Sequence, residues 1–322
     1  MGMGCWAIGG ASLNVDGSVL GYGNIRDEDS IKAIHKGIDL GITLFDTSDA
    51  YGCGRSERVL GEALQDYRDD VIIATKFGWE WDFNSNNPNI PCRLVREKEL
   101  DPQSIFNSLM RSMERLQTEY IDLFQLHLPT MKFEKIPEVV EMLEQLEEEG
   151  YIINYGWSTP NPDLAKVFAT GKYCTAIQFR HNIFSHNDAM IEEVLKPFNL
   201  AGLIHGPLGY GFLTGKYLSK TDLPEEHMWS NIDFTKGRAS DMNSNLKEII
   251  PILTSDGRTI AQGALGWIWA QNEMLIPIPG FKNIEQVEEN ASAMDYGPLK
   301  KNQLDEIDEI LKKIETPSTW LN

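Results

Sequence analysis

Short hydrophobic runs alternate with amphipathic stretches along most of the chain. Each run is about as long as a β-strand, and several are rich in β-branched or aromatic residues, which is typical of buried strands. The eight runs are Met3–Ile8, Ile42–Phe45, Val71–Thr75, Ile121–Leu126, Tyr151–Tyr155, Cys174–Phe179, Ala201–Ile204 and Leu275–Ile278. The stretches with helical spacing of apolar residues are Ser30–Leu40, Ser56–Gln65, Pro102–Leu116, Pro137–Glu149, Asp163–Ala169, Asp188–Leu195, Thr259–Ala270 and Ile284–Met294.

Strands that are each followed by a helix are expected to pair in parallel, in either a closed barrel or an open doubly wound sheet. An open sheet that binds a dinucleotide should carry Gly-x-Gly-x-x-Gly after its first strand. The segments that begin Gly21-Tyr22-Gly23 and Gly209-Tyr210-Gly211 both lack the third glycine. We therefore predict an α/β fold of the (β/α)8 TIM-barrel type, with residues 1–322 as a single domain.

The net charge and the cysteine content argue against several classes of function. The formal net charge of -19 argues against nucleic acid and against an anionic membrane surface, because both partners require a basic face. The four cysteines are scattered without a C-x-x-C pair, so free thiols in a reducing cytosol are expected. We find neither a signal peptide nor an apolar run long enough to span a bilayer, and we expect a cytoplasmic protein. The sequence leaves the oligomeric state open, with a monomer slightly favoured.

Polar side chains follow three consecutive apolar runs. Asp46, Lys76 and His127 each stand directly after a run, and Tyr51 lies in the loop that Asp46 begins. Taken singly, each could be a salt bridge, a turn residue or a structural hydrogen bonder. Because the carboxyl ends of barrel strands meet at one mouth, we expect all four side chains to converge there.

These four residue types suit the reduction of a carbonyl group. A phenol with its ordinary pKa near 10 is a weak acid at neutral pH, and a nearby ammonium should lower that pKa. Asp46 would keep Lys76 charged and in position, and His127 could donate a hydrogen bond to the substrate carbonyl oxygen. Tyr51 would then protonate that oxygen while hydride reaches the carbon.

Two long connections are expected at the same mouth. They span 77–100 and 217–257, and long ordered loops on a compact domain are more often functional than not. Trp79 in the first connection is expected to line the substrate pocket, although simple packing of the loop on the rim is the alternative.

Several segments, taken together in chain order, resemble the aldo-keto reductase family over nearly the whole chain. They are Gly41-Ile42-Thr43-Leu44-Phe45-Asp46-Thr47-Ser48-Asp49-Ala50-Tyr51-Gly52, Ser56-Glu57 with Leu60-Gly61, Ala74-Thr75-Lys76, Tyr120-Ile121-Asp122-Leu123 with His127, and Ile278-Pro279-Gly280-Phe281-Lys282 with Gln286, Glu289 and Asn290. The resemblance implies a (β/α)8 barrel, NADPH as the cofactor, and the four residues above as the catalytic site.

The resemblance also implies positions for the nicotinamide half of NADP. Ser158, Thr159 and Gln178 would hold the carboxamide, with Thr159 standing where the family often has Asn. His205 stands where an aromatic ring usually stacks on the nicotinamide. Leu208 would lie in the segment that passes under the pyrophosphate.

The adenosine half is implied by the C-terminal segment. Gly280 belongs to this cofactor-binding segment, and Lys282 would lie near the 2′-phosphate, where a lysine is a point charge and the family's frequent arginine is bidentate. Gln286 replaces another frequent cation of the family. Glu289 and Asn290 match its adenine contacts.

Three further expectations concern the first strand and the histidines. Trp6 resembles a family position beside the substrate. The first barrel strand begins almost at Met1, so the N-terminal hairpin that usually covers the barrel floor is expected to be lacking. His181 and His186 have no Cys, Asp or Glu at ligand spacing, so no metal site is expected.

Two other functions remain open at this point. A non-catalytic barrel that binds nucleotide and regulates a partner protein would need the fold but not the chemistry. A lyase that forms a Schiff base on Lys76 would need that amine neutral and desolvated, whereas Asp46 favours its charged form.

Overall fold

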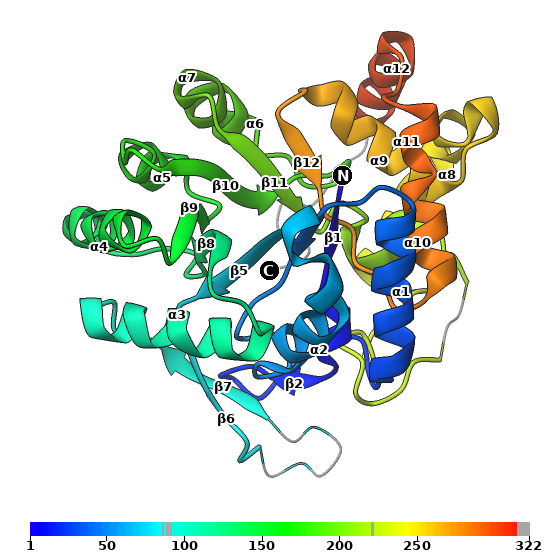
Figure 1. Cartoon of the computed structure of the whole chain (residues 1–322). Coiled ribbons are helices and arrows are strands. Elements are labelled where there is room, and N and C mark those ends of the chain that lie inside the picture. The colour runs from blue at the N-terminus through cyan, green and yellow to red at the C-terminus, as the bar shows by residue number, and fades with distance from the viewer. Residues whose placement is uncertain (86, 88–89, 91, 220–221, 314–322) are drawn as a thin grey trace.

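The fold is built on an eight-stranded parallel sheet that curves into a barrel (Figure 1). It is seen in a computed structural model that describes residues 1–85, 87, 90, 92–219 and 222–313. The strands pair in chain order, which is the order that eight β–α repeats produce. They are β1 (Gly2–Gly4), β4 (Leu44–Asp46), β5 (Ile72–Phe77), β8 (Ile121–Leu126), β9 (Ile152–Ser158), β10 (Cys174–Arg180), β11 (Ala201–His205) and β12 (Leu275–Pro277).

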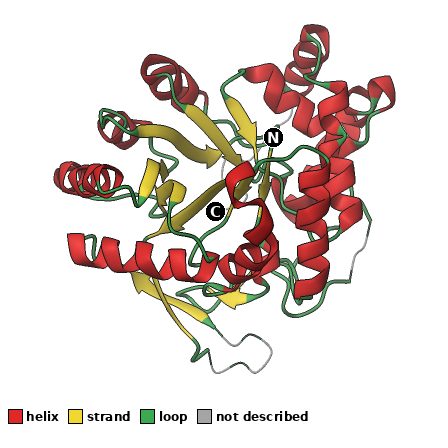
Figure 2. Ribbon diagram, in the orientation of Figure 1, coloured by secondary structure: helices red, strands yellow, loops and turns green. Residues whose placement is uncertain are grey.

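Helices surround the strands on the outside of the barrel, as Figure 2 shows. Their apolar faces pack on the sheet and form one continuous core with it. The helices that follow the strands are α1 (Asp27–Asp39), α2 (Arg55–Leu64), α3 (Pro102–Leu116), α4 (Ile136–Glu148), α5 (Pro162–Phe168), the helical segment 188–198, α9 (Ile260–Gln271) and α10 (Ile284–Ala291). Each overlaps its predicted stretch, so the predicted barrel is confirmed.

Capping residues place the starts of several helices. The Asp101 carboxylate accepts the backbone N–H of Ser104 at 3.0 Å, and Pro102 follows as the first residue of α3. Asn161 caps α5 in the same way, with Pro162 next. Thr259 and Gln262 form a reciprocal capping box at the start of α9. These local signals fix where each helix leaves the mouth of the barrel.

The first predicted strand is too long. Only Gly2–Gly4 is a strand, and the end of that apolar run forms the 3-10 turn Ala7–Gly9. All three turn residues are buried, so their apolar character reflects burial at the mouth and not strand pairing.

The connection 77–100 is more ordered than predicted. It contains the antiparallel strands β6 (Trp79–Asp82) and β7 (Arg93–Glu97). A hairpin of β2 (Ser12–Leu13) and β3 (Val19–Leu20) joins them, which gives a second sheet in the order β3-β2-β7-β6. This sheet lies below α2 in Figure 1.

The C-terminal part carries three helices beyond the repeat. The connection 217–257 contains α8 (Gly237–Leu253), and α11 (Ala293–Tyr296) and α12 (Lys301–Lys312) follow α10. The predicted single domain extends to residue 322, and residues 314–322 lie outside the described part. Within the described part, none of the helices combines the length and the hydropathy needed to cross a bilayer.

The barrel is closed where β1 meets the chain that follows β12. The Gly4 N–H donates to the carbonyl oxygen of Pro279 at 2.9 Å, and Gly4 bridges Gly280 in parallel. A Cβ added at Gly4 would lie 2.6 Å from the carbonyl oxygen of Ile278, so the approach of these two backbones requires glycine. At Gly280 an added Cβ would meet only an ordinary contact of 3.8 Å.

We therefore expect Gly4→Ala to be destabilising, because the new methyl group must push the seam apart. Overpacking of this kind costs about 1–3 kcal/mol. Urea unfolding followed by circular dichroism would measure the loss, and Gly280→Ala in the same seam is the matched control. Equal unfolding free energies for the two variants would contradict this account of the seam.

Candidate active site

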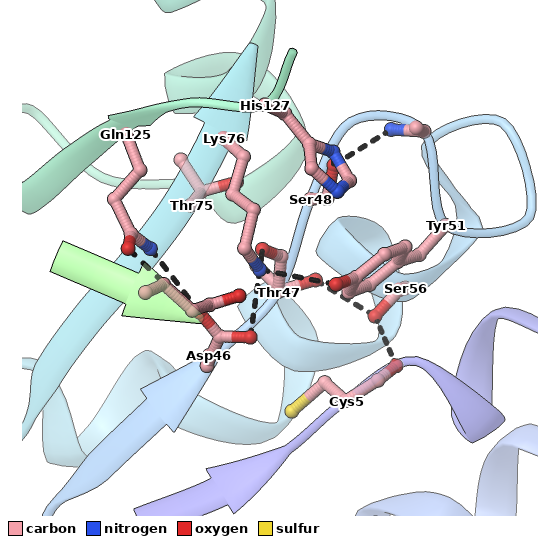
Figure 3. A network of polar contacts seen from close by, with 12 residues as sticks. Cys5, Asp46, Thr47, Ser48, Tyr51, Ser56, Thr75, Lys76, Gln125 and His127 are labelled. Carbon is pink, nitrogen blue, oxygen red and sulfur yellow. Dashed lines mark hydrogen bonds and ion pairs between the residues drawn. The ribbon is translucent and has the colours of Figure 1, made fainter. Parts of the chain in front are cut away.

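The four predicted side chains meet at the carboxyl ends of the strands (Figure 3). Asp46 ends β4, Lys76 lies near the end of β5, His127 follows β8, and Tyr51 lies in the loop between β4 and α2. The Lys76 Nζ atom donates to Asp46 Oδ2 at 2.7 Å and to the Tyr51 hydroxyl at 3.1 Å. Its third hydrogen bond goes to the carbonyl oxygen of Thr47, also at 2.7 Å. The ammonium is thus fully satisfied.

The second oxygen of Asp46 accepts two side-chain amides. Gln178 Nε2 donates to Asp46 Oδ1 at 2.8 Å, and Gln125 Nε2 donates to the same atom at 3.2 Å. Sequence reasoning did not identify Gln125. Its signal is a fully buried glutamine inside the apolar run of β8, where an amide needs a polar partner.

Lys76 is charged in this setting. Its side chain is 0% exposed, and burial alone would lower the pKa of the amine. The Asp46 carboxylate and the Tyr51 hydroxyl outweigh that effect, so the pKa of Lys76 is raised above its ordinary value. A protonated amine is no nucleophile, and this setting therefore argues against a Schiff base on Lys76.

The phenol of Tyr51 differs from the expectation. Burial raises its pKa to about 12, although the neighbouring Lys76 acts in the opposite direction. The predicted net lowering by the ammonium is therefore wrong for the protein alone. Its cause is the loss of water around the half-buried ring at the cavity wall, which disfavours the charged phenolate. At neutral pH Tyr51 holds its proton.

His127 is uncharged. Burial, Lys76 and His205 together hold the pKa of its imidazole well below its usual range. The Nδ1 atom lies 3.1 Å from the Ser48 hydroxyl, which also accepts the backbone N–H of Ala50 at 3.1 Å. With one acceptor site of Ser48 occupied in this way, its hydroxyl hydrogen can point to Nδ1. When that hydrogen points to Nδ1 and not to Asp49 Oδ1, which lies 3.5 Å from the hydroxyl, Nε2 carries the hydrogen of the ring.

The turn after Tyr51 is packed tightly against the first strand segment. Gly52 has a φ of 58°, and a Cβ added there would lie 1.9 Å from the carbonyl oxygen of Gly9. Ser56, at the start of α2, donates to the carbonyl oxygen of Cys5 at 2.7 Å. These contacts leave the Tyr51 loop little freedom to move.

Asp46, Tyr51 and His127 line a cavity of about 610 Å³, and the fully buried Lys76 lies behind them. Aromatic rings form part of its wall: the Trp6 ring lies 5.2 Å from Tyr22, 6.4 Å from Tyr51 and 5.8 Å from Tyr210, measured between centroids. Trp79, whose indole N–H donates to the carbonyl oxygen of His127 at 2.9 Å, also lines the cavity. The cavity therefore joins the polar cluster to an apolar wall.

Most of the residues expected to hold a cofactor line this cavity. They are Ser158, Gln178, His205, Leu208, Gly280, Lys282, Gln286, Glu289 and Asn290. Thr159 does not line it: its hydroxyl donates to the carbonyl oxygen of Pro129 at 2.7 Å and serves the strand end. Burial lowers the pKa of His205 to about 3, so this ring is neutral.

Two lysines lie close to one tyrosine ring in the same cavity. The Nζ atoms of Lys216 and Lys282 lie 5.8 Å and 5.5 Å from the centroid of Tyr22. Burial, followed by the nearby Lys282, lowers the pKa of Lys216 to about 8. Sequence reasoning missed Lys216, which stands in the turn after the Gly209-Tyr210-Gly211 segment. Two cations this close favour an anion between them.

A metal ion has no evident place. Among the residues that the structure describes, nowhere do three or more His, Cys, Asp or Glu side chains gather in a way that could bind one. His181 and His186 lie 5.6 Å apart, and each is engaged by the backbone around residues 183–187.

Comparisons with known proteins agree with this architecture. The profile of the Aldo/keto reductase family matches residues 1–312. An aldo-keto reductase from Bacillus subtilis is 31% identical over 304 residues, covering 89% of this chain and 82% of that protein. An NADH-specific methylglyoxal reductase from Escherichia coli is 28% identical, covering 92% of this chain and 89% of that protein.

A solved structure extends the comparison to three dimensions. The glycerol dehydrogenase from Gluconobacter oxydans is 26% identical and superposes with a TM-score of 0.82, covering 98% of this chain and 92% of that one. The chain belongs to the aldo/keto reductase family.

The buried ion pair makes a stability prediction. Asp46→Asn keeps the shape of the side chain but leaves the Lys76 ammonium without its counter-charge, which costs about 3–5 kcal/mol for a buried pair. Asp46→Asn/Lys76→Met removes both charges and should recover a large part of that loss. Denaturant unfolding of the four proteins in the double-mutant cycle measures the coupling. Additive losses from the two substitutions would show that the pair is not coupled.

Proposed function

We propose that the protein reduces aldehydes or ketones to alcohols with NADPH, and that Tyr51 is the general acid. The observation that carries this proposal is the hydrogen bond of 3.1 Å between Lys76 Nζ and the Tyr51 hydroxyl at the wall of the cavity. A bound nicotinamide supplies the hydride that reaches the carbonyl carbon. The residues of this chain supply the proton, its stabilisation and the orientation of the substrate.

The proton path starts at the Tyr51 hydroxyl. Tyr51 gives its proton to the carbonyl oxygen as negative charge develops there, and the resulting phenolate is stabilised by the Lys76 ammonium. Asp46 holds that ammonium charged and in place through the bond of 2.7 Å. Neutral His127 donates a hydrogen bond from Nε2 to the same substrate oxygen, which fixes its direction and stabilises the developing charge.

The raised pKa of Tyr51 suits reduction. With a pKa of about 12, the phenol stays protonated across the physiological range, so the acid form is always present. Proton donation is favoured in the transition state because Lys76 stabilises the phenolate more than the phenol. Removal of the last waters by substrate and cofactor would strengthen this interaction, since Coulomb energy grows as the dielectric falls.

The nicotinamide half of the cofactor fits at the polar end of the cavity. Ser158 and Gln178 line the cavity at the ends of β9 and β10, where they can hold the carboxamide. Neutral His205, at the end of β11, offers a flat ring for stacking without adding a positive charge.

The choice of NADPH is supported by the two lysines beside Tyr22. A chain with a net charge of -19 places an exposed cation, Lys216, and a half-buried one, Lys282, on the wall of the cavity, and such a pair suits the phosphate groups of a dinucleotide. Lys282, next to Gln286 and Glu289, would favour a 2′-phosphate over a hydroxyl. Since one relative is NADH-specific, this preference rests on the lysines and not on family membership.

Tyr51→Phe tests the proposed acid. We expect kcat with NADPH and a small aldehyde to fall by about 10²–10⁴-fold, because the positioned proton is lost. The dissociation constant for NADPH, measured by fluorescence titration, should stay unchanged. Tyr67→Phe, far from the cavity, is the matched control and should keep full activity. Undiminished turnover by the Tyr51 variant would refute the role of Tyr51.

Activity and binding measurements of this kind also distinguish a reductase from a non-catalytic barrel that regulates a partner protein. A barrel that binds nucleotide and regulates a partner would bind NADPH tightly yet reduce no member of a broad aldehyde and ketone panel. That result in the unaltered protein would favour regulation over catalysis.

The pKa of Lys216 predicts a pH-dependent affinity. Below about pH 8 the amine is charged in the free protein, and above it the charge is progressively lost. A bound phosphate stabilises the ammonium, so the dissociation constant for NADPH should rise above pH 8, by at most about tenfold per pH unit. Fluorescence titrations between pH 6.5 and about 9.5 measure this. Lys216→Met should bind more weakly below pH 8 and lose the dependence, whereas Lys301→Met on the outer helix α12 should retain it.

A further inference from the structure

Two buried cysteine thiols lie next to the catalytic loop, outside the reaction just described. Cys53 stands two residues after Tyr51 in the turn that leads to α2, and Cys92 directly precedes β7. The Cys53 Sγ atom lies 3.8 Å from the carbonyl oxygen of Arg93, the residue after Cys92, so these two buried thiols are neighbours, which sets them apart from Cys5 and Cys174. All four are free thiols in this structure.

The two thiols join separate parts of the fold. Cys53 lies on the Tyr51 turn, and its Sγ atom also donates to the carbonyl oxygen of Arg93 at 3.8 Å. The carbonyl oxygen of Cys92 accepts the backbone N–H of Leu13 at 3.0 Å, which ties it to β2. A bond between the two sulfur atoms would therefore connect the Tyr51 turn to the four-stranded sheet, whose residues Trp79 and Leu94 line the cavity.

The two thiols differ in the direction of their pKa shifts. Cys92 raises the pKa of the neighbouring Cys53, and burial adds to that effect. Cys53 in turn lowers the pKa of Cys92, with a smaller contribution from Arg58. Cys92 is thus the better nucleophile of the pair, since the thiolate is the reactive form. Cys53 lies in place to resolve any adduct that Cys92 forms.

We propose that Cys53 and Cys92 form a reversible disulfide on exposure to a low-molecular-weight disulfide such as oxidised glutathione, and that this bond restrains the sheet over the cavity. The Cys92 thiolate attacks one sulfur of glutathione disulfide and releases one glutathione thiol. Cys53 then loses its proton, attacks the sulfur of Cys92, and releases the second glutathione. Two protein thiols are oxidised and one disulfide molecule is reduced, so electrons and protons balance.

The surroundings decide which side moves. Cys53 has a φ of 52°, and the adjacent Gly52 is pressed against the backbone of Gly9, so the turn cannot shift far. The pairing of β2 with β7 has a single register pair, Leu13 with Arg93. Oxidant enters, and the sulfur atoms close to bonding distance, by movement of β7. The oxidised sheet is held nearer to Tyr51, which hinders entry of substrate.

Mass spectrometry of the full chain tests the bond itself. The protein is incubated with oxidised glutathione under native conditions, alkylated, and mapped by non-reducing proteolysis. We expect a loss of two hydrogen atoms, a crosslinked peptide that contains Cys53 and Cys92, and complete reversal by dithiothreitol. Cys53→Ser and Cys92→Ser should form no crosslink, whereas Cys174→Ser, with a buried thiol at a strand start, should crosslink as the unaltered chain does.

The consequence of the bond has two readouts. Hydrogen exchange in β6 and β7 should slow in the oxidised protein, and this does not depend on the proposed activity. The kcat/KM for an aldehyde should fall by about tenfold, because small displacements near a catalytic group are costly. The fall should be absent in Cys92→Ser.

Other outcomes would overturn the proposal. A stable glutathione adduct without the crosslink, pairing with a different cysteine, or no reaction would show that the pair is not a disulfide site. Unchanged exchange and unchanged kcat/KM in the crosslinked protein would show that the bond restrains nothing. If the reduced protein has no reductase activity, the proposed function fails, while the crosslink and the exchange rates still judge the disulfide.

Discussion

The site depends on one interaction, the ion pair between the buried Lys76 ammonium and the Asp46 carboxylate. A fully enclosed amine would by itself lose its proton, because burial disfavours the charged form. The bond of 2.7 Å to Asp46 reverses that preference. Because this positive charge is held next to the Tyr51 hydroxyl, it can stabilise the phenolate more than the phenol when the proton leaves. Everything else around the cluster holds this pair in position.

The fold supplies that support through the geometry of parallel strands. Asp46 and Lys76 come from neighbouring strands, so their side chains approach at one end of the sheet. The amides of Gln125 and Gln178, from β8 and β10, occupy the remaining oxygen of Asp46. Four strands thus converge on one carboxylate, and its orientation is a property of the whole barrel. Closure of the barrel at Gly4 therefore also affects the geometry of the site at the mouth.

The sequence predicts the barrel and the four-residue cluster because both follow from periodic burial and from where each apolar run ends. It does not predict the β6–β7 sheet, since Trp79–Asp82 is a short polar-apolar alternation inside a loop. The sequence also does not predict the direction of the pKa shift of Tyr51, because burial of the ring outweighs the effect of the nearby charge. Lys216 is missed for a similar reason: its turn becomes part of the cavity only in three dimensions.

The two lysines and the two cysteines differ in their surroundings. Lys216 and Lys282 face the cavity in a strongly acidic protein, so their charge is held where a polyanion can neutralise it. Cys53 and Cys92 are neighbours shielded from solvent, one on the Tyr51 turn and one directly before β7. Since the Tyr51 turn is braced by Gly9 on one side and by this thiol pair on the other, a change of covalent state at the thiols acts on the catalytic loop directly. No transmission through the barrel core is needed, and the strands that hold Lys76 and Asp46 stay in place.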